Sequence, residues 1–167
     1  MEENILEIVE KSCQIHRDVI AVKYLSHRDI VEKSYGDLWD DIRKTAIILR
    51  NKGLCGTHIA LVGSSSYEWI CAYMAILFMG NTAVPLDANL SVSELHELLN
   101  RSGSTALFCG ASRKDVITEL TDVCPEMNIV FTMEKKVDIE HLEGADSNPQ
   151  LAILSFEQLR NEITIPD

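Results

Sequence analysis

Apolar residues recur along the chain with two spacings, and the spacing predicts which segments form helices and which form strands. A period of three to four residues is typical of a helix with one buried face. Four stripes show it: Ile5, Val9 and Cys13 or Leu6; Leu38, Ile42, Ala46 and Leu49; Leu95, Leu98 and Leu99; and Val116, Leu120 and Val123. Short apolar runs predict strands at 58–62, 82–86, 105–109 and 128–132, with a last strand at 152–154.

Serine residues mark the predicted helix starts. In a capping box, a serine hydroxyl accepts from a free N–H of the first turn, while the acid or amide three residues later reaches back to the serine backbone. Five serines have such a partner: Ser34 with Asp37, Ser65 with Glu68, Ser91 with Glu94, Ser112 with Asp115, and Ser155 with Gln158. We therefore expect five capped helices and one more near the N-terminus.

The helix predicted after Ser65 differs from the others because it is apolar on every side from 69 to 79. Such a helix is expected to be surrounded by other elements, with Trp69 substantially buried. Gly80 and Asn81 follow it and are typical of a helix end.

The four apolar runs start 24, 23 and 23 residues apart, which leaves room for one helix and two short loops between strands. Strand–helix–strand at this spacing implies parallel pairing through right-handed crossovers. The predicted fold class is therefore α/β, a doubly wound and mostly parallel sheet with helices on both faces. Segments 19–25 and 29–33 precede it and predict an antiparallel hairpin, and the polar segment 134–150 predicts a surface loop.

Charge and cysteine content exclude several classes of protein. The formal net charge of −11 argues against unspecific binding of nucleic acid. The longest apolar run, at 69–79, is too short to span a bilayer, and no secretion signal precedes it. The five cysteines include no Cys-x-x-Cys pair, so we expect free thiols, no bound zinc and a cytoplasmic location.

Ligands of doubly wound sheets bind beyond the carboxyl ends of the strands, here 63–66, 87–91, 110–112 and the loop after 132. Gly63 to Ser66 could hold an anion at a helix N-terminus, but the segment lacks both nucleotide-binding fingerprints, so helix capping is favoured. Glu68 and Trp69 are better explained as a cap and a core aromatic than as pocket walls, and Asp87 as a turn former.

No constellation of catalytic, cofactor-binding or metal-ligating residues is visible in the sequence. The histidines lack metal-ligand spacing, and His96 and His141 are expected at the surface. The chain has five histidines, which are His16, His27, His58, His96 and His141. No serine has the nucleophile-elbow spacing, and no cysteine has a context that marks it as catalytic. We therefore assign no site residue of these three kinds.

From Ser34 to Phe108 the order of residues resembles the N-terminal region of the acyl-adenylate-forming (AMP-binding) ligases. This superfamily contains acyl-CoA synthetases, luciferases and the adenylation domains of peptide synthetases. The resemblance rests on Tyr35, Leu38, 49–53, Gly56, 58–63, 66–69, Ala75, Gly80, 83–87, Glu94, Leu95, Leu98, Leu99, Ser102 and Gly103. The residues at 67–69 (Tyr-Glu-Trp) and 84–87 (Val-Pro-Leu-Asp) are most similar to those of bacterial long-chain-fatty-acid CoA ligases, although Ser65 stands where such sequences more often have Asn.

The resemblance implies that residues 1–167 are the N-terminal subdomain of a larger ligase. Residues 1–57 would be its helix, hairpin and helix, and 58–167 its βαβαβαβ part. The parent would activate a fatty acid with ATP and Mg²⁺ and transfer the acyl group to CoA, with the phosphate loop and catalytic lysine downstream. Two alternatives stay open: a fragment of an amino-acid-activating adenylation domain, and a free-standing ligand-binding module without catalysis.

Overall fold

In a computed structural model, which describes residues 4–26, 28–133 and 150–165, the chain folds around a five-stranded parallel sheet. The elements are α1 (Ile5–Ile15), β1 (Ile20–Ser26), β2 (Asp29–Ser34), α2 (Tyr35–Asn51), β3 (His58–Val62), α3 (Tyr67–Phe78), β4 (Thr82–Leu86), α4 (Val92–Ser102), β5 (Ser104–Cys109), the 3-10 helix η1 (Ala111–Ile117), α5 (Leu120–Val123), β6 (Ile129–Thr132), β7 (Ala152–Ser155) and α7 (Phe156–Glu162). Most of the predicted loop 134–150 lies outside the described residues.

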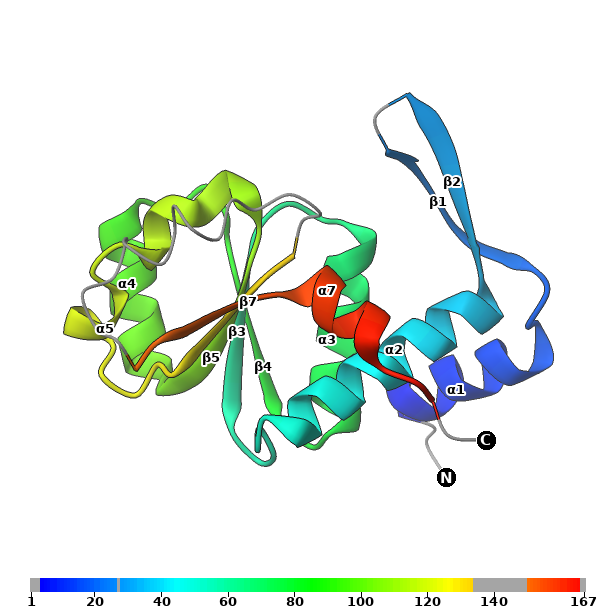
Figure 1. Cartoon of the computed structure of the whole chain (residues 1–167), viewed down its shortest axis with the longest axis horizontal. Coiled ribbons are helices and arrows are strands. Elements are labelled where there is room, and N and C mark those ends of the chain that lie inside the picture. The colour runs from blue at the N-terminus through cyan, green and yellow to red at the C-terminus, as the bar shows by residue number, and fades with distance from the viewer. Residues whose placement is uncertain (1–3, 27, 134–149, 166–167) are drawn as a thin grey trace.

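The sheet has the order β4-β3-β5-β6-β7, and all four pairings are parallel. One core cluster joins its first face to α2, α3 and α7, and a second joins the opposite face to α4, η1 and α5. Figure 1 shows these two groups of helices on either side of the strands. The predicted doubly wound α/β class is therefore confirmed.

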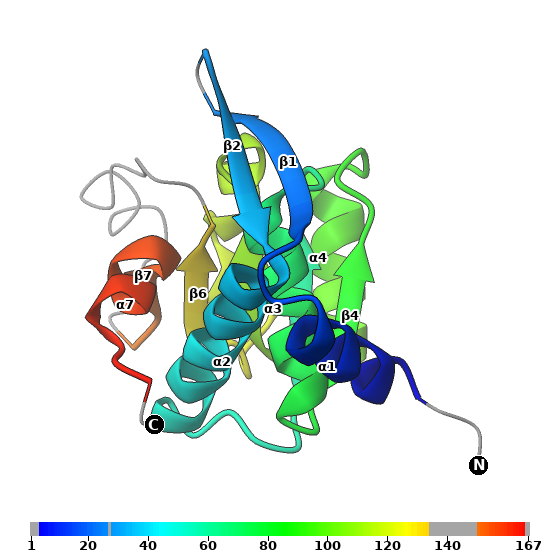
Figure 2. The same cartoon turned by 90° about the vertical axis from the view of Figure 1, so that its right-hand side faces the viewer.

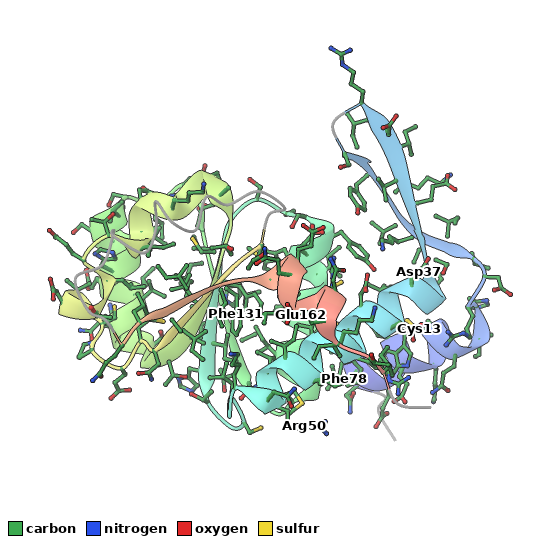
Figure 3. All side chains as sticks on the ribbon, viewed as in Figure 1. Cys13, Asp37, Arg50, Phe78, Phe131 and Glu162 are labelled. Atoms are coloured by element: carbon green, nitrogen blue, oxygen red, sulfur yellow. The ribbon has the colours of Figure 1, made fainter. Side chains whose placement is uncertain are left out.

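Aromatic rings fill the first core between the sheet and α7. Phe108 stacks on Phe131 with ring centroids 4.7 Å apart, and Phe156 meets Phe108 edge-on at 5.3 Å. Phe131 lies at the middle of the sheet in Figure 3. Each of the three rings is fully buried, so together they fix α7 against the strands.

The predicted antiparallel hairpin is confirmed as β1 paired with β2, and α1 precedes it. It projects from the body above α2 and α3 (Figure 2), while Ala21, Val22 and Tyr24 of β1 pack against the first core. At its foot, the Ser34 backbone and hydroxyl each donate to the Asp37 carboxylate at 2.9 Å, where α2 begins (Figure 3). These contacts join the hairpin directly to a helix.

Three of the five predicted serine caps are confirmed. Ser34 and Ser91 form complete capping boxes, and the Ser155 hydroxyl accepts from the Gln158 backbone N–H. The cap predicted at Ser65 is wrong by one residue, because the Ser66 hydroxyl accepts from the Trp69 backbone N–H at 3.1 Å.

The helix predicted after Ser112 is also wrong. The chain forms the 3-10 helix η1 there, without a side-chain cap, and then the separate four-residue α5. The backbone of Arg113 is non-helical (φ −126°, ψ 29°), and Glu119 adopts a left-handed conformation before α5. These two breaks turn Val123 outward, although the other two members of its predicted stripe are buried.

Helix α3 is not surrounded on every side, contrary to expectation. Tyr67, Cys71, Ala72, Met74, Ala75 and Ile76 are buried, but Ile70 is 37% exposed. Trp69 is partly buried, packs against the core, and stacks on Tyr73 with centroids 5.2 Å apart. One side of this apolar helix is therefore left without cover by the described residues.

Candidate functional site

The carboxyl ends of β3 and β5 form the topological switch point of the sheet. After β3 the chain crosses to β4 on one side, and it then returns to β5 on the other side of β3. Doubly wound sheets bind ligands at such a point because the two following connections leave toward opposite faces. Here the loops 63–66 and 110–112, both singled out from the sequence, come together.

Two glycines bring these loops into direct contact. The Gly110 N–H donates to the Val62 carbonyl at 2.8 Å, and a Cβ placed on Gly63 would lie 3.1 Å from the Gly110 backbone. The same Cβ would lie 3.3 Å from the terminal carbon of Met133. Backbone atoms and a methionine thus occupy the space directly between the two strand ends.

The N-terminus of α3 supports the capping interpretation of 63–66. Ser66 supplies the cap, whereas Ser64 and Ser65 are exposed. No lysine or arginine occurs between Gly63 and Gly80. This segment therefore presents a helix terminus and no side-chain cation to an anion.

The loop after β4 is held by a buried arginine that the sequence did not single out. The Arg113 guanidinium donates to the carbonyls of Ala88 and Leu90 at 2.6 and 2.8 Å, and it pairs with Asp115 at 3.1 Å. This hydrogen bond lowers the pKa of the Asp115 carboxyl. Asp87 accepts from the Asn89 backbone and side chain, which confirms its role as a turn former.

A second set of polar groups that the sequence did not indicate lies between α2, α3, α7 and the foot of the hairpin. The Tyr67 hydroxyl donates to Asp41 at 2.9 Å, and the Lys33 ammonium lies 3.4 Å from the same carboxylate. The Arg160 guanidinium lies 3.9 Å from Asp41 and 3.8 Å from Glu68. We call these five residues the junction cluster.

Burial dominates the chemistry of the junction cluster. It raises the pKa of the Tyr67 hydroxyl, and nearby Cys71 and Asp41 raise it further. Burial also raises the pKa of the neighbouring Cys71 thiol to about 12. A phenol and a thiol that stay protonated at neutral pH are poor nucleophiles, so the cluster is suited to holding elements together.

Histidines and cysteines form no further site in the part of the chain that the structure describes. His96 is half-buried rather than at the surface, and its Nε2 contacts the Val116 carbonyl at 2.8 Å, joining α4 to η1. No group of three or more His, Cys, Asp or Glu side chains among the described residues could hold a metal ion. All five cysteines are described, none of them forms a disulfide, and four of them are buried. His141 lies outside the described residues.

Two hollows lie away from the switch point. An open groove of about 790 Å³ runs between α4, η1 and α5, and Glu97, Asp115 and Glu119 make it acidic. A smaller hollow of about 280 Å³ is lined by Trp39 and Phe78 among others, with Glu10 and Arg43 also in its wall.

No helix within the described residues is long and apolar enough to cross a membrane.

Comparison with known proteins places these features in a wider context. The family model described as "AMP-binding enzyme" matches residues 9–162. The acyl-CoA ligase cnsG of Penicillium expansum is 28% identical over 106 residues, 63% of this chain and 22% of that protein. The hybrid PKS-NRPS synthetase apdA of Emericella nidulans is 33% identical over 90 residues, 53% of this chain and 2% of that protein.

Solved structures share the fold over nearly the whole chain. The A-PCP didomain of a carboxylic acid reductase from Segniliparus rugosus, solved with AMP, superposes with a TM-score of 0.84 at 14% identity. That match covers 99% of this chain and 28% of the other. Coronafacic acid ligase from Pectobacterium brasiliense gives a TM-score of 0.79 at 21% identity, over 96% of this chain and 30% of the ligase. The chain thus spans less than a third of the length of each of these four proteins.

Proposed function

The chain belongs to the family of AMP-binding enzymes, and from this premise we propose that it is the N-terminal part of an ATP-dependent acyl-CoA ligase. The observation that carries the proposal is the family match over 9–162, on a fold that superposes on adenylating enzymes several times longer. Two curated relatives bear the name of a CoA ligase, which favours thioester formation over the other outcomes in the family.

In the proposed reaction, a carboxylate attacks the α-phosphate of ATP, giving an acyl-adenylate and releasing pyrophosphate. The thiol of CoA then attacks the acyl carbon and releases AMP. ATP, Mg²⁺ and CoA would be bound largely by the remaining ligase, because the described loops offer them little. The part described here would serve as a scaffold that sets the relative positions of the strand ends.

For the acid we propose a long-chain fatty acid. The support is in the sequence, where the segments 67–69 and 84–87 resemble those of bacterial long-chain-fatty-acid CoA ligases. The structure gives both segments a structural role, since the Tyr67 hydroxyl donates to Asp41 and Asp87 closes the turn after β4. We also propose a cytoplasmic location, because free thiols suit a reducing compartment.

An amino-acid-activating adenylation domain is the second candidate. It is favoured by two relatives that are peptide synthetases, the hybrid synthetase apdA and the cyclosporin synthetase simA of Tolypocladium inflatum. Both share 31–33% identity with this chain over about 100 residues. A free-standing ligand-binding module is the third, and it would lack any downstream phosphate loop.

The test starts from the complete reading frame, in which a Thr-Ser-Gly-Thr-Thr-Gly-type loop soon after Asp167 is expected. The encoded protein is then assayed for pyrophosphate exchange with long-chain fatty acids and with amino acids, and for CoA thioester formation. Fatty-acid-dependent exchange with thioester formation supports the proposal. Exchange that depends on amino acids, without a CoA thioester, supports the adenylation domain instead. A frame without the loop, or no exchange with any acid, overturns both.

A further inference from the structure

The guanidinium of Arg113 lies buried between two loops at the carboxyl ends of the strands. The residue is only 8% exposed, and a buried charge of this kind is stable only when it is paired and hydrogen-bonded. Its Nη1 atom donates to the carbonyls of Ala88 and Leu90, which lie 25 and 23 residues earlier in the chain. Nε and Nη2 donate to the two carboxylate oxygens of Asp115 at 3.1 and 3.2 Å. This bidentate pair neutralises the charge and fixes the plane of the guanidinium.

The backbone of Arg113 is held as well as its side chain. Its N–H donates to the Gly110 carbonyl at 2.9 Å, and its own carbonyl accepts from the Cys109 thiol at 3.2 Å. Gly110 in turn packs against Gly63, which follows β3. A chain of contacts therefore runs from the end of β3, through Gly110 and Arg113, to the loop 87–91.

The three loops that these contacts join contain no lysine or arginine, and they are 63–66, 87–91 and 110–112. The loop 87–91 turns polar side chains outward, since Asp87 and Asn89 are exposed. Ligands of doubly wound sheets bind at this edge. An edge without free cations suits an uncharged stretch of a substrate better than it suits phosphates.

Building on the proposed function, we propose that Arg113 is a positioning residue of the ligase. It holds the loop 87–91 in the shape that binds an uncharged stretch of substrate, either the chain of the acid or the arm of CoA. Without the guanidinium, the carbonyls of Ala88 and Leu90 lose their donor, and the loop adopts other conformations. The substrate then finds only a fraction of the molecules ready to bind, which raises KM and leaves the chemical step unchanged.

The test compares Arg113→Ala with Arg101→Ala in the complete ligase. Arg101 is the matched control, because it pairs with Glu97 on the surface of α4, where the two side chains are 71% and 67% exposed. Hydrogen exchange of the amides in 87–91 reports on the loop. Initial rates with ATP, the acid and CoA varied in turn report on binding. In Arg113→Ala alone we expect about tenfold faster exchange in 87–91 and about tenfold higher KM for the acid or CoA, with kcat and the KM for ATP within about twofold.

Two milder substitutions carry the test if the alanine variant does not fold. The ammonium of Arg113→Lys can reach one of the carbonyls but cannot also form the planar pair with Asp115, so this variant should recover part of the affinity. Asp115→Asn removes the charge from that pair and keeps the arginine, so its rise in KM should be smaller. The substrate whose KM rises identifies the source of the uncharged chain.

Unchanged KM values for both the acid and CoA in the folded variants of Arg113 would overturn the inference, even if the loop exchanges faster. A rise confined to ATP, or an equal rise in Arg101→Ala, would overturn it as well. The proposed function is judged separately by the unaltered ligase. If that protein activates no acid, the proposed function fails, whereas an active ligase with unchanged KM values refutes only the positioning role.

Discussion

The Tyr67 hydroxyl donates a 2.9 Å hydrogen bond to the Asp41 carboxylate and so joins the first turn of α3 to α2. Both residues are buried, and the carboxylate also forms an ion pair with Lys33 at the foot of the hairpin. One acidic side chain thus holds two helices and the hairpin together. A charge in this position is tolerable only because each neighbour contributes a donor or a positive charge.

Removing the Tyr67 hydroxyl is therefore expected to destabilise the fold. Tyr67→Phe keeps the ring and its stacking on Tyr24 but leaves Asp41 without its shortest hydrogen bond, at a cost of about 1–3 kcal/mol. Urea unfolding at neutral pH measures the loss. Tyr73→Phe is the matched control, since that hydroxyl has no partner among the described residues, and it should change the free energy of unfolding by less than about 0.5 kcal/mol. Equal stability of the two variants would contradict this role.

The start of α3 gives a second test, in which sequence and structure disagree by one residue. The structure places the cap at Ser66, so Ser66→Ala should cost about 1 kcal/mol of unfolding free energy, while Ser65→Ala should cost almost nothing. Both substitutions make the same chemical change at neighbouring positions, and each therefore controls for the other. A larger loss at Ser65 would restore the capping box with Glu68 that the sequence predicts.

The contact between the two switch-point loops makes a third prediction. Gly63 has φ +147° and its added Cβ would meet the Gly110 backbone at 3.1 Å, so Gly63→Ala is expected to cost about 2 kcal/mol or more. Gly53→Ala is the control, because Gly53 also has a positive φ (+72°) but open space around it, and its cost should stay near 1 kcal/mol. Thermal or urea unfolding of the two variants, followed by circular dichroism of the β-sheet signal, measures both losses of stability. Equal losses would contradict the prediction that Gly63 is required by its contact with Gly110.

Much of the fold was predictable because it depends on local pattern. The predicted strands 58–62 and 82–86 coincide with β3 and β4, since a short apolar run between turn residues leaves few alternatives. The junction cluster was not predictable. Asp40 and Asp41 are adjacent acids between Trp39 and Ile42, and only the tertiary fold buries Asp41 against Tyr67 and Arg160.

The breaks in the helix around η1 were also not predictable from the local sequence. The stripe Val116, Leu120 and Val123 has helical spacing, but the Arg113 side chain reaches the carbonyls of the loop after β4, and its backbone leaves the helical region. A contact between residues 25 positions apart in the sequence overrides local preference there. Three of the four candidate loops, 63–66, 87–91 and 110–112, follow β3, β4 and β5 as predicted, and the loop after 132 lies largely outside the described residues. The packing of Gly63 on Gly110, in contrast, depends on which strands become neighbours.

The last prediction concerns the chain of 167 residues alone, which we expect neither to bind ATP with useful affinity nor to adenylate a fatty acid. Triphosphate binding and adenylyl transfer depend on backbone donors, cations and Mg²⁺ placed around the phosphates. The loop 63–66 offers a helix N-terminus, which contributes about 0.3–1 kcal/mol, against the roughly 8 kcal/mol of micromolar binding. The net charge of −11 opposes the approach of a polyanion further. Calorimetric titration with Mg-ATP and a pyrophosphate-exchange assay with a long-chain fatty acid test this, with the complete ligase as the positive control. A dissociation constant in the low micromolar range, or exchange above background, would show that these residues form a nucleotide site without the remaining ligase.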